Sequence, residues 1–301
     1  MAKTCLGIDL GGTKILAGVM DESGHILEQK EVPTPDTGDA IVEALIRLSQ
    51  HFSKRYALQA VGVGTPGQVA FPEGIILGCT PNLKDWEKRN LRQALEQSLS
   101  LDVIVDNDAL VATYAELKMG SGKGFKDFVL LTLGTGLGSG IVSRGQISRG
   151  HHDLGIGFGH MIVEARGRHC NCGQQGCLES YVSGVGIQKT YRLKGGALEV
   201  STPMIFQRAL AGEPLAMETL DQTWTFLAVG LVNIFNTLAP EVVLLGGGIS
   251  RQGENVMLAP LRRKVKGIMG MPFRTPESIR LAEFTSQAGM IGAGLMAFEA
   301  S

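Results

Sequence analysis

Three cysteines, Cys170, Cys172 and Cys177, lie within the eight-residue stretch CNCGQQGC. Cysteines grouped this tightly, in a chain with an odd total of five, are more often metal ligands or redox groups than structural bridges. Cys170 and Cys172 are too close in sequence to bridge each other easily. Gly173 and Gly176 allow the backbone to curl so that all three sulfurs face one point. The pattern therefore favours a metal site over the alternative of free thiols.

A tetrahedral zinc ion needs four ligands, so three cysteines require one more. His160 and His169 are both candidates. His169 adjoins Cys170, and neighbouring side chains usually diverge, so we favour His160, at the end of a glycine-rich loop. With four protein ligands the site has no open position, and we expect a structural Zn²⁺ that fixes the loops around His160 and Glu179.

Two glycine-rich turns follow apolar strands, DLGGTK at residues 9–14 and GTGLGSG at residues 134–140. Turns of this kind leave backbone N–H groups unpaired, and such nests hold anions. Neither turn fits the P-loop spacing or a clean dinucleotide fingerprint, and either alone would fit a tight hairpin. Because both occur at matching places, we expect them to bind phosphates through Asp9, Gly11, Gly12, Thr13 and Lys14 and through Gly134, Thr135, Gly136 and Gly138.

A third glycine cluster follows the apolar strand predicted at residues 242–245. Gly246, Gly247 and Gly248 suit a flat ligand surface such as an adenosine, although a plain entry into a helix would also explain them.

The two main turns belong to a repeated pattern. An apolar strand, a glycine-rich turn, a strand, a second turn and a third strand occur at residues 5–32 and again at residues 128–150. Helical spacing predicts helices at residues 40–56, 91–99 and 224–238. The fold class is therefore α/β, with two related domains and a cleft between them.

The composition argues against several classes of partner. The 301-residue chain has a formal net charge of −1, which favours neither a nucleic acid nor an anionic membrane. No apolar run reaches the ~20 residues of a membrane span, and the first residues, MAKTCLGIDLGGTK, enter a strand directly, so we expect no signal peptide. Because five cysteines make no disulfide framework, we expect a cytoplasmic protein.

Taken together, the motifs resemble the ROK family of bacterial sugar kinases and related repressors, within the actin-like ATPase superfamily. The resemblance covers essentially the whole chain and rests on DLGGTK, GTPG at 64–67, TPNL at 80–83, DNDA at 106–109, GTGLGSG, GHM at 159–161, CNCGQQGCLES and LLGGG at 244–248. It implies a two-domain actin-like (ribonuclease H-like) fold with an interdomain cleft. The N-terminal domain would span residues 1–117, with a helix at about 288–301 packing back on it, and the domain with the zinc loop would span residues 118–287.

The resemblance also implies a reaction, the ATP-dependent phosphorylation of a hexose, commonly at the 6-hydroxyl. The sugar would be glucose, fructose, mannose or an N-acetylhexosamine. Asp108 would be the catalytic base and Asp9 would orient Mg²⁺. The implied sugar-binding residues are Gly67, Asn82, Asn107, Asp108, His160 and Glu179, with His160 also a zinc ligand, and by analogy the protein would be a homodimer. Without the resemblance, Asp108 fits the N-cap of a helix predicted at residues 109–117.

The chain departs from the family pattern at two positions. Gly157 stands where the family has a sugar-binding glutamate, and Leu110 stands where it usually has asparagine. Asp153 is four residues from Gly157, too far along the chain for direct substitution. The departures allow a different sugar, weak sugar binding with a working base, or a drift toward a sensor. Because the catalytic groups persist, we favour a kinase.

Two other functions compete with the kinase. A sugar-responsive repressor would carry a helix-turn-helix segment before the first turn, and the start of that turn at Asp9 leaves no room for one. A chaperone-like or actin-like ATPase would not need the cysteine stretch or the DNDA motif.

Overall fold

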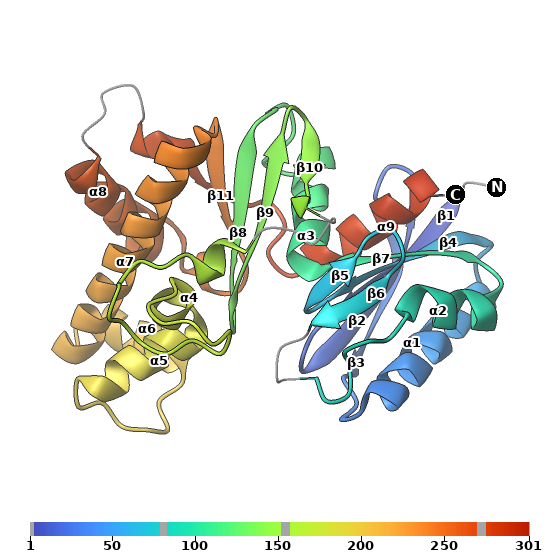
Figure 1. Ribbon diagram of the computed structural model, residues 1–301, viewed down its shortest axis with the longest axis horizontal. Coiled ribbons are helices and arrows are strands. Elements are labelled where there is room, and N and C mark those ends of the chain that lie inside the picture. The colour runs from blue at the N-terminus through green and yellow to red at the C-terminus, as the bar shows by residue number, and fades with distance from the viewer. Residues whose placement is uncertain (1–2, 79–82, 152–156, 270–274, 301) are drawn as a thin grey trace. The chain divides into compact units, whose positions relative to one another are not determined.

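The computed structural model describes residues 3–78, 83–151, 157–269 and 275–300 (Figure 1). The chain forms two compact units, each with its own hydrophobic core. The first unit comprises Met1–Gly124, Gln146–Ile156 and Ser286–Ser301, and the second comprises Phe125–Gly145 and Gly157–Thr285.

The first sheet has five strands in the order β3-β2-β1-β4-β7. β1 pairs antiparallel with β2 and parallel with β4, and β4 pairs parallel with β7. The strands are β1 Thr4–Leu10, β2 Lys14–Asp21, β3 Ile26–Pro33, β4 Leu58–Thr65 and β7 Asp102–Asn107, and a separate hairpin consists of β5 Gln68–Ala70 and β6 Ile75–Gly78. The helices of this unit are α1 Gly38–Ser53, α2 Leu91–Leu99, α3 Asp108–Lys118 and α9 Ala288–Ala300.

The second sheet also has five strands, in the order β10-β9-β8-β11-β12. They are β8 Phe128–Leu133, β9 Leu137–Ser143, β10 Gln146–Ser148, β11 Val242–Gly246 and β12 Ile279–Leu281. The α-helices of the second unit are α4 Glu179–Val182, α5 Gly184–Leu193, α6 Thr202–Leu210, α7 Pro214–Leu238 and α8 Ala259–Ile268. Short helical turns are η2 Phe158–His160, η3 Ile249–Gln252, η4 Glu254–Leu258 and η5 Pro276–Ser278.

The two sheets repeat one pairing scheme. In each, a hairpin strand pairs antiparallel with its successor and parallel with a later strand, as β8 does with β9 and β11. The outer parallel pairs β4–β7 and β11–β12 complete the match. The predicted α/β class with two related halves is therefore confirmed.

Close backbone packing holds α9 against the first sheet and α3. A Cβ atom at Gly62 of β4 would lie 1.9 Å from the carbonyl oxygen of Ala293, and one at Gly292 would lie 1.9 Å from that of Val111. Real Cβ atoms do not approach oxygen this closely, so glycine is required where α9 crosses β4 and α3. This packing fixes the helix beside the ends of the strands that carry the candidate site.

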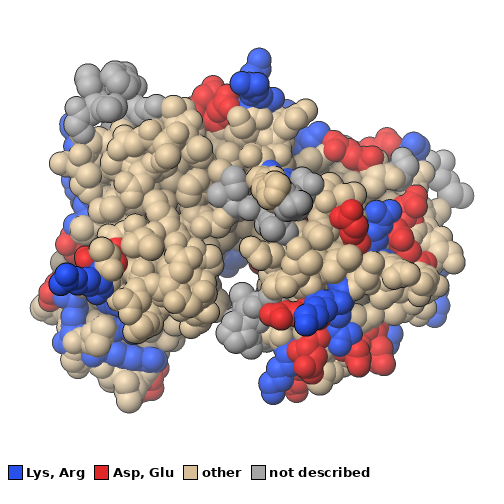
Figure 2. Space-filling view, viewed as in Figure 1, with Lys and Arg blue, Asp and Glu red and all other residues tan. Residues whose placement is uncertain are grey.

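Within the described part of the chain, no helix combines the length and the hydropathy that a bilayer crossing requires. In the space-filling view, basic and acidic side chains lie interspersed on the face shown over α1 and α2 (Figure 2).

Candidate functional site

Parallel strands bring acidic residues of the first unit to one edge of its sheet. Asp9 of β1 lies in register with Gly64 of β4, which in turn lies in register with Asp106 of β7. The C-terminal ends of parallel strands are where α/β proteins bind ligands. Asn107 ends β7, and Asp108 follows at once as the first residue of α3.

Asn107 is the N-cap of α3, so the interpretation of Asp108 as the cap is wrong. The Oδ1 atom of Asn107 accepts hydrogen bonds from the N–H groups of Ala109 and Leu110, at 3.0 and 3.3 Å. Its Nδ2 group donates to the carbonyl oxygen of Gly67 at 2.9 Å. Asp108 accepts from the N–H of Ala109 at 2.8 Å. Because the asparagine amide satisfies two helix N–H groups, the cap does not depend on Asp108, and the carboxylate of Asp108 can accept a further hydrogen bond.

Burial raises the pKa values of Asp9 and Asp108 at these strand ends. Burial raises the pKa of Asp108 to about 6 and, together with the negative charge of Asp108, raises the pKa of Asp9 to about 7. The bonds from Ala109 and Asn107 act in the opposite direction on Asp108, as Lys14 does on Asp9. A carboxylate with a pKa near neutral is suited to take up a proton at physiological pH.

A glycine at the start of α9 makes room for Asp9. A Cβ atom at Gly289 would lie 2.5 Å from the Cγ of Asp9. Any larger residue at position 289 would therefore displace this carboxylate.

The first glycine turn is a closed hairpin. The N–H of Gly11 donates to the carbonyl of Lys14 at 2.9 Å, and the hydroxyl of Thr34 donates to the carbonyl of Gly11 at 2.7 Å. The carbonyl of Thr13 accepts from the N–H of Thr34 at 3.0 Å. The Lys14 ammonium forms an exposed ion pair with Glu31 on the adjacent strand, at 2.6 Å. The structure places Gly12 at the tip between these bonds.

The second glycine turn holds Glu179. The N–H of Leu137 donates to Glu179 Oε2 at 2.8 Å, and a Cβ atom at Gly136 would lie only 2.7 Å from the same oxygen. The carbonyl of Gly134 accepts from the N–H of Gly184 at 2.8 Å. Thr135 lies in the turn and Gly138 lies in β9. The turn is thus tied to the start of α4 and of α5.

The third glycine cluster ends β11. Gly247 has φ +82°, and a Cβ atom there would lie 2.5 Å from the carbonyl oxygen of Leu133. Both conditions require glycine. Gly246 is the last residue of β11, and Gly248 precedes η3.

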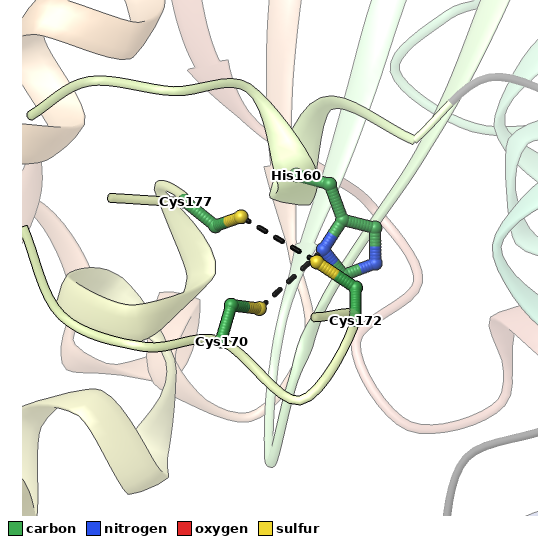
Figure 3. Close-up of side chains that lie close together, drawn as sticks. All are labelled: His160, Cys170, Cys172 and Cys177. Carbon is green, nitrogen blue, oxygen red and sulfur yellow. Dashed lines mark hydrogen bonds between the residues drawn. The ribbon is translucent and has the colours of Figure 1, made fainter. Parts of the chain in front are cut away.

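The four predicted metal ligands come together in the second unit. His160, Cys170, Cys172 and Cys177 offer ligand atoms that all lie within 4.8 Å of one another, and Figure 3 shows the side chains converging on one space. The Sγ atoms of Cys172 and Cys177 are 3.6 Å apart, and His160 Nδ1 is 3.7 Å from Cys170 Sγ. Zinc–sulfur bonds of 2.3 Å in a tetrahedron separate two sulfurs by about 3.8 Å. The spacing and the donor set therefore fit Zn²⁺.

The second candidate histidine lies elsewhere. The ring of His169 contacts the side-chain amide of Gln175, at 3.1 and 3.3 Å. Glu179 Oε1 lies 4.0 Å from Cys170 Sγ, so Glu179 touches both the cysteine cluster and the second glycine turn.

His160 owes its place to Gly159, whereas Gly157 is not required by the packing. A Cβ atom at Gly159 would lie 2.3 Å from the carbonyl oxygen of Leu137, so η2 can pack against β9 only with glycine there. Gly157 is different, because the one atom of the described residues that a Cβ atom there would meet is His160 Cδ2, at an ordinary 3.5 Å. Its φ of −104° is accessible to any residue.

One ion pair of the first unit was missed by the sequence analysis. Arg149 donates to Asp106 and forms an ion pair with it, 43 positions away in the chain. A carboxylate near the end of a buried strand indicates that a cation is needed, but nothing local identifies which one. Asn82, predicted to bind sugar, lies outside the described residues.

This chain belongs to the ROK family, whose sequence pattern it matches over residues 5–300. It is 34% identical to a glucokinase of Streptomyces coelicolor over 311 residues, covering 98% of this chain and 97% of the relative. It is 33% identical to an N-acetyl-D-glucosamine kinase of Pectobacterium atrosepticum, covering 96% and 97%. The crystal structure of a ROK family glucokinase from Streptomyces griseus in complex with glucose and AMPPNP has a TM-score of 0.87 at 32% identity and covers 98% and 99%.

Proposed function

We propose that the protein is an ATP-dependent hexose kinase that phosphorylates glucose or an N-acetylhexosamine, with Asp108 as the catalytic base. The observation that carries the proposal is the partly buried Asp108 carboxylate at the first residue of α3, whose raised pKa suits proton abstraction. Membership of the ROK family and the similarity to glucokinases and an N-acetyl-D-glucosamine kinase support the same chemistry.

In the proposed reaction, Asp108 accepts the proton of the sugar 6-hydroxyl while that oxygen forms a bond to the γ-phosphorus of ATP, and the bond from this phosphorus to the bridging oxygen breaks so that ADP leaves. Asn107, held by its bonds to Ala109 and Gly67, presents its amide to a sugar hydroxyl, and the backbone of Gly67 contributes a further contact. Most of the rate enhancement in phosphoryl transfer comes from positioning and charge stabilisation. The rigid cap of α3 supplies positioning for the base.

Asp9 is the proposed magnesium-binding residue. Its carboxylate offers the hard oxygen ligand that Mg²⁺ prefers, and a single carboxylate leaves the ion its waters and the phosphates of ATP. When bound, the ion neutralises charge on the transferred phosphoryl group. Gly289 keeps the space at Asp9 open.

The glycine turns are the proposed nucleotide-binding elements. Residues of 11–14 and of 134–138 would contact the phosphates, and Gly246, Gly247 and Gly248 would face the adenosine. Their support is the run of glycines itself, together with the close packing of Gly247 against the backbone of Leu133, where no side chain fits.

The metal is proposed to be a structural Zn²⁺. It would be bound by His160 and the three cysteines, and the ion would hold in place the segment that carries His160 and Glu179, the proposed ligands of sugar hydroxyls. The contact of Glu179 with Cys170 supports this arrangement.

A coupled assay of nucleotide consumption over a panel of hexoses tests the proposal. We expect turnover that requires a sugar, with glucose and N-acetylhexosamines among the substrates. The alternative is a ROK-type sugar sensor with weak or no kinase activity, which the replacement of the family glutamate by Gly157 favours. Sugar binding without turnover would support the sensor, and turnover without any sugar would reject both.

Gly157→Glu is expected to tighten glucose binding about tenfold. A carboxylate at this position would accept charge-assisted hydrogen bonds from sugar hydroxyls, each worth about 1.5–3 kcal/mol. The backbone and the space at position 157 accommodate a side chain. Isothermal titration calorimetry measures the change, with Gly157→Gln as the neutral control. Unchanged or weaker glucose binding in the glutamate variant would show that the position does not face the sugar.

A further inference from the structure

Arg149, immediately after β10, is a largely buried cation. Its side chain is 13% exposed, and its guanidinium carbon lies 3.7 Å from the ring centroid of Phe71. The Nη1 group donates to Asp106 Oδ2 in an ion pair, and the Asp106 side chain is only 2% exposed. Stacking on an aromatic face while pairing with a carboxylate is a use for which arginine is better suited than lysine.

The other oxygen of Asp106 reaches the candidate site. Asp106 Oδ1 accepts from the backbone N–H of Asn107 at 2.8 Å. Asn107 in turn caps α3 and bonds Gly67. A continuous series of bonds therefore runs from Arg149 through Asp106 and Asn107 to the first turn of α3, where Asp108 lies.

Charge explains why Asp106 needs its partner. A buried carboxylate without a cation is costly, and removing one member of a buried pair leaves an uncompensated charge. Asp9 and Asp108 are two further carboxylates at the same strand ends. Loss of Arg149 removes the cation that pairs with Asp106 Oδ2, so the side chain of Asp106 is held less firmly and its bond to Asn107 is disturbed.

We propose that Arg149 is a positioning residue for phosphoryl transfer, holding Asp106 so that the peptide of Asn107 and the carboxylate of Asp108 keep their reactive orientation. The inference rests on the proposed kinase function. A purely structural ion pair would stabilise the fold without acting on the rate of the chemical step. The two roles make different predictions for kcat.

Arg149→Met is expected to lower kcat about 100-fold while the KM for ATP changes less than threefold, because small displacements of catalytic groups cost about that much. Asp106→Asn keeps an oxygen that can accept from the N–H of Asn107 and needs no cation. The double variant Arg149→Met with Asp106→Asn should therefore recover at least about tenfold in kcat over Arg149→Met alone. Arg149→Lys, which keeps the charge but not the stacked plane, should fall between wild type and Arg149→Met.

Steady-state kinetics and thermal melts of all four variants decide the matter. A kcat of Arg149→Met within threefold of wild type, with only a lower melting temperature, overturns the inference. A double variant no better than Arg149→Met also overturns it, because Arg149 would then act without Asp106. A wild-type protein that transfers no phosphoryl group defeats the proposed function and the inference together, whereas an active wild type with an active Arg149→Met defeats the inference alone.

Discussion

Replacing Asp108 by asparagine is expected to lower the rate of sugar phosphorylation by about 10³-fold, with ATP binding retained. Removing a general base typically costs 10²- to 10⁴-fold. Asparagine keeps an oxygen that accepts from the N–H of Ala109 but cannot take up the proton of the sugar hydroxyl. The helix cap belongs to Asn107, so α3 should remain intact.

The measurement is a coupled kinase assay together with nucleotide titration. Asp102→Asn is a matched control, since Asp102 is an exposed carboxylate at the other end of the same strand. Turnover of Asp108→Asn near the wild-type rate would remove Asp108 from its proposed role. A loss of nucleotide binding equal to the loss of rate would show a collapsed site rather than a missing base.

The pH dependence of activity and of stability provides a second test of the role of Asp108. Because the base works deprotonated, wild-type kcat/KM should rise with pH through about 6, the raised pKa of Asp108. Over the same pH range, the contribution of Asp108 to the free energy of unfolding should fall as the pH rises. A carboxyl whose folded pKa is raised contributes stability below its unfolded pKa and loses it as pH rises through the folded value. At pH 8 the free energy of unfolding of Asp108→Asn should therefore exceed that of wild type by on the order of 3 kcal/mol, from 1.36 kcal/mol per pKa unit, whereas at pH 4 the two should be nearly equal.

The sequence predicted best those features that depend on local spacing. Three cysteines within eight residues and a histidine in a glycine-flanked turn were enough to select His160 over His169, because adjacent side chains diverge. The repeated strand–turn–strand pattern was enough for two sheets with one pairing scheme.

The sequence analysis did not predict features that depend on packing. The helix predicted at residues 224–238 begins ten positions earlier, at Pro214, and its first turns bury Ala216, Thr219 and Leu220. The cap of α3 was assigned to Asp108 rather than Asn107, a choice between two adjacent residues with equal capping tendency.

Charge partners also depend on packing. Lys14, expected to face a phosphate, pairs with Glu31 because β2 and β3 place the two side chains together across the hairpin. Arg149 and Asp106 lie 43 positions apart in the chain, and the fold brings them together as an ion pair. Distance in sequence carries no information about such pairs, so the electrostatics of the site required the structure.

Loss of the metal is expected to reduce both stability and sugar phosphorylation. Cys172→Ser should abolish stoichiometric zinc binding, because serine does not supply a thiolate, and the exposed position of Cys172 keeps the packing cost small. Without the ion, the segment carrying His160 loses its cross-link to the cysteine stretch. Glu179 then loses the neighbour that fixes it beside the second glycine turn. We expect kcat/KM for the sugar to fall about 100-fold, since two charge-assisted contacts are weakened.

Metal analysis by mass spectrometry, thermal melts and the kinase assay measure these effects on the same preparations. His169→Ala is the matched control, because His169 is the exposed neighbour of the cluster whose ring contacts Gln175 instead. It should keep one zinc per chain and full activity, whereas His160→Ala should resemble Cys172→Ser. Chelated wild type should regain activity when Zn²⁺ is returned, and Cys172→Ser should not. Full activity and an unchanged melting temperature in metal-free wild type would mean that the four side chains hold the sugar-binding segment without an ion.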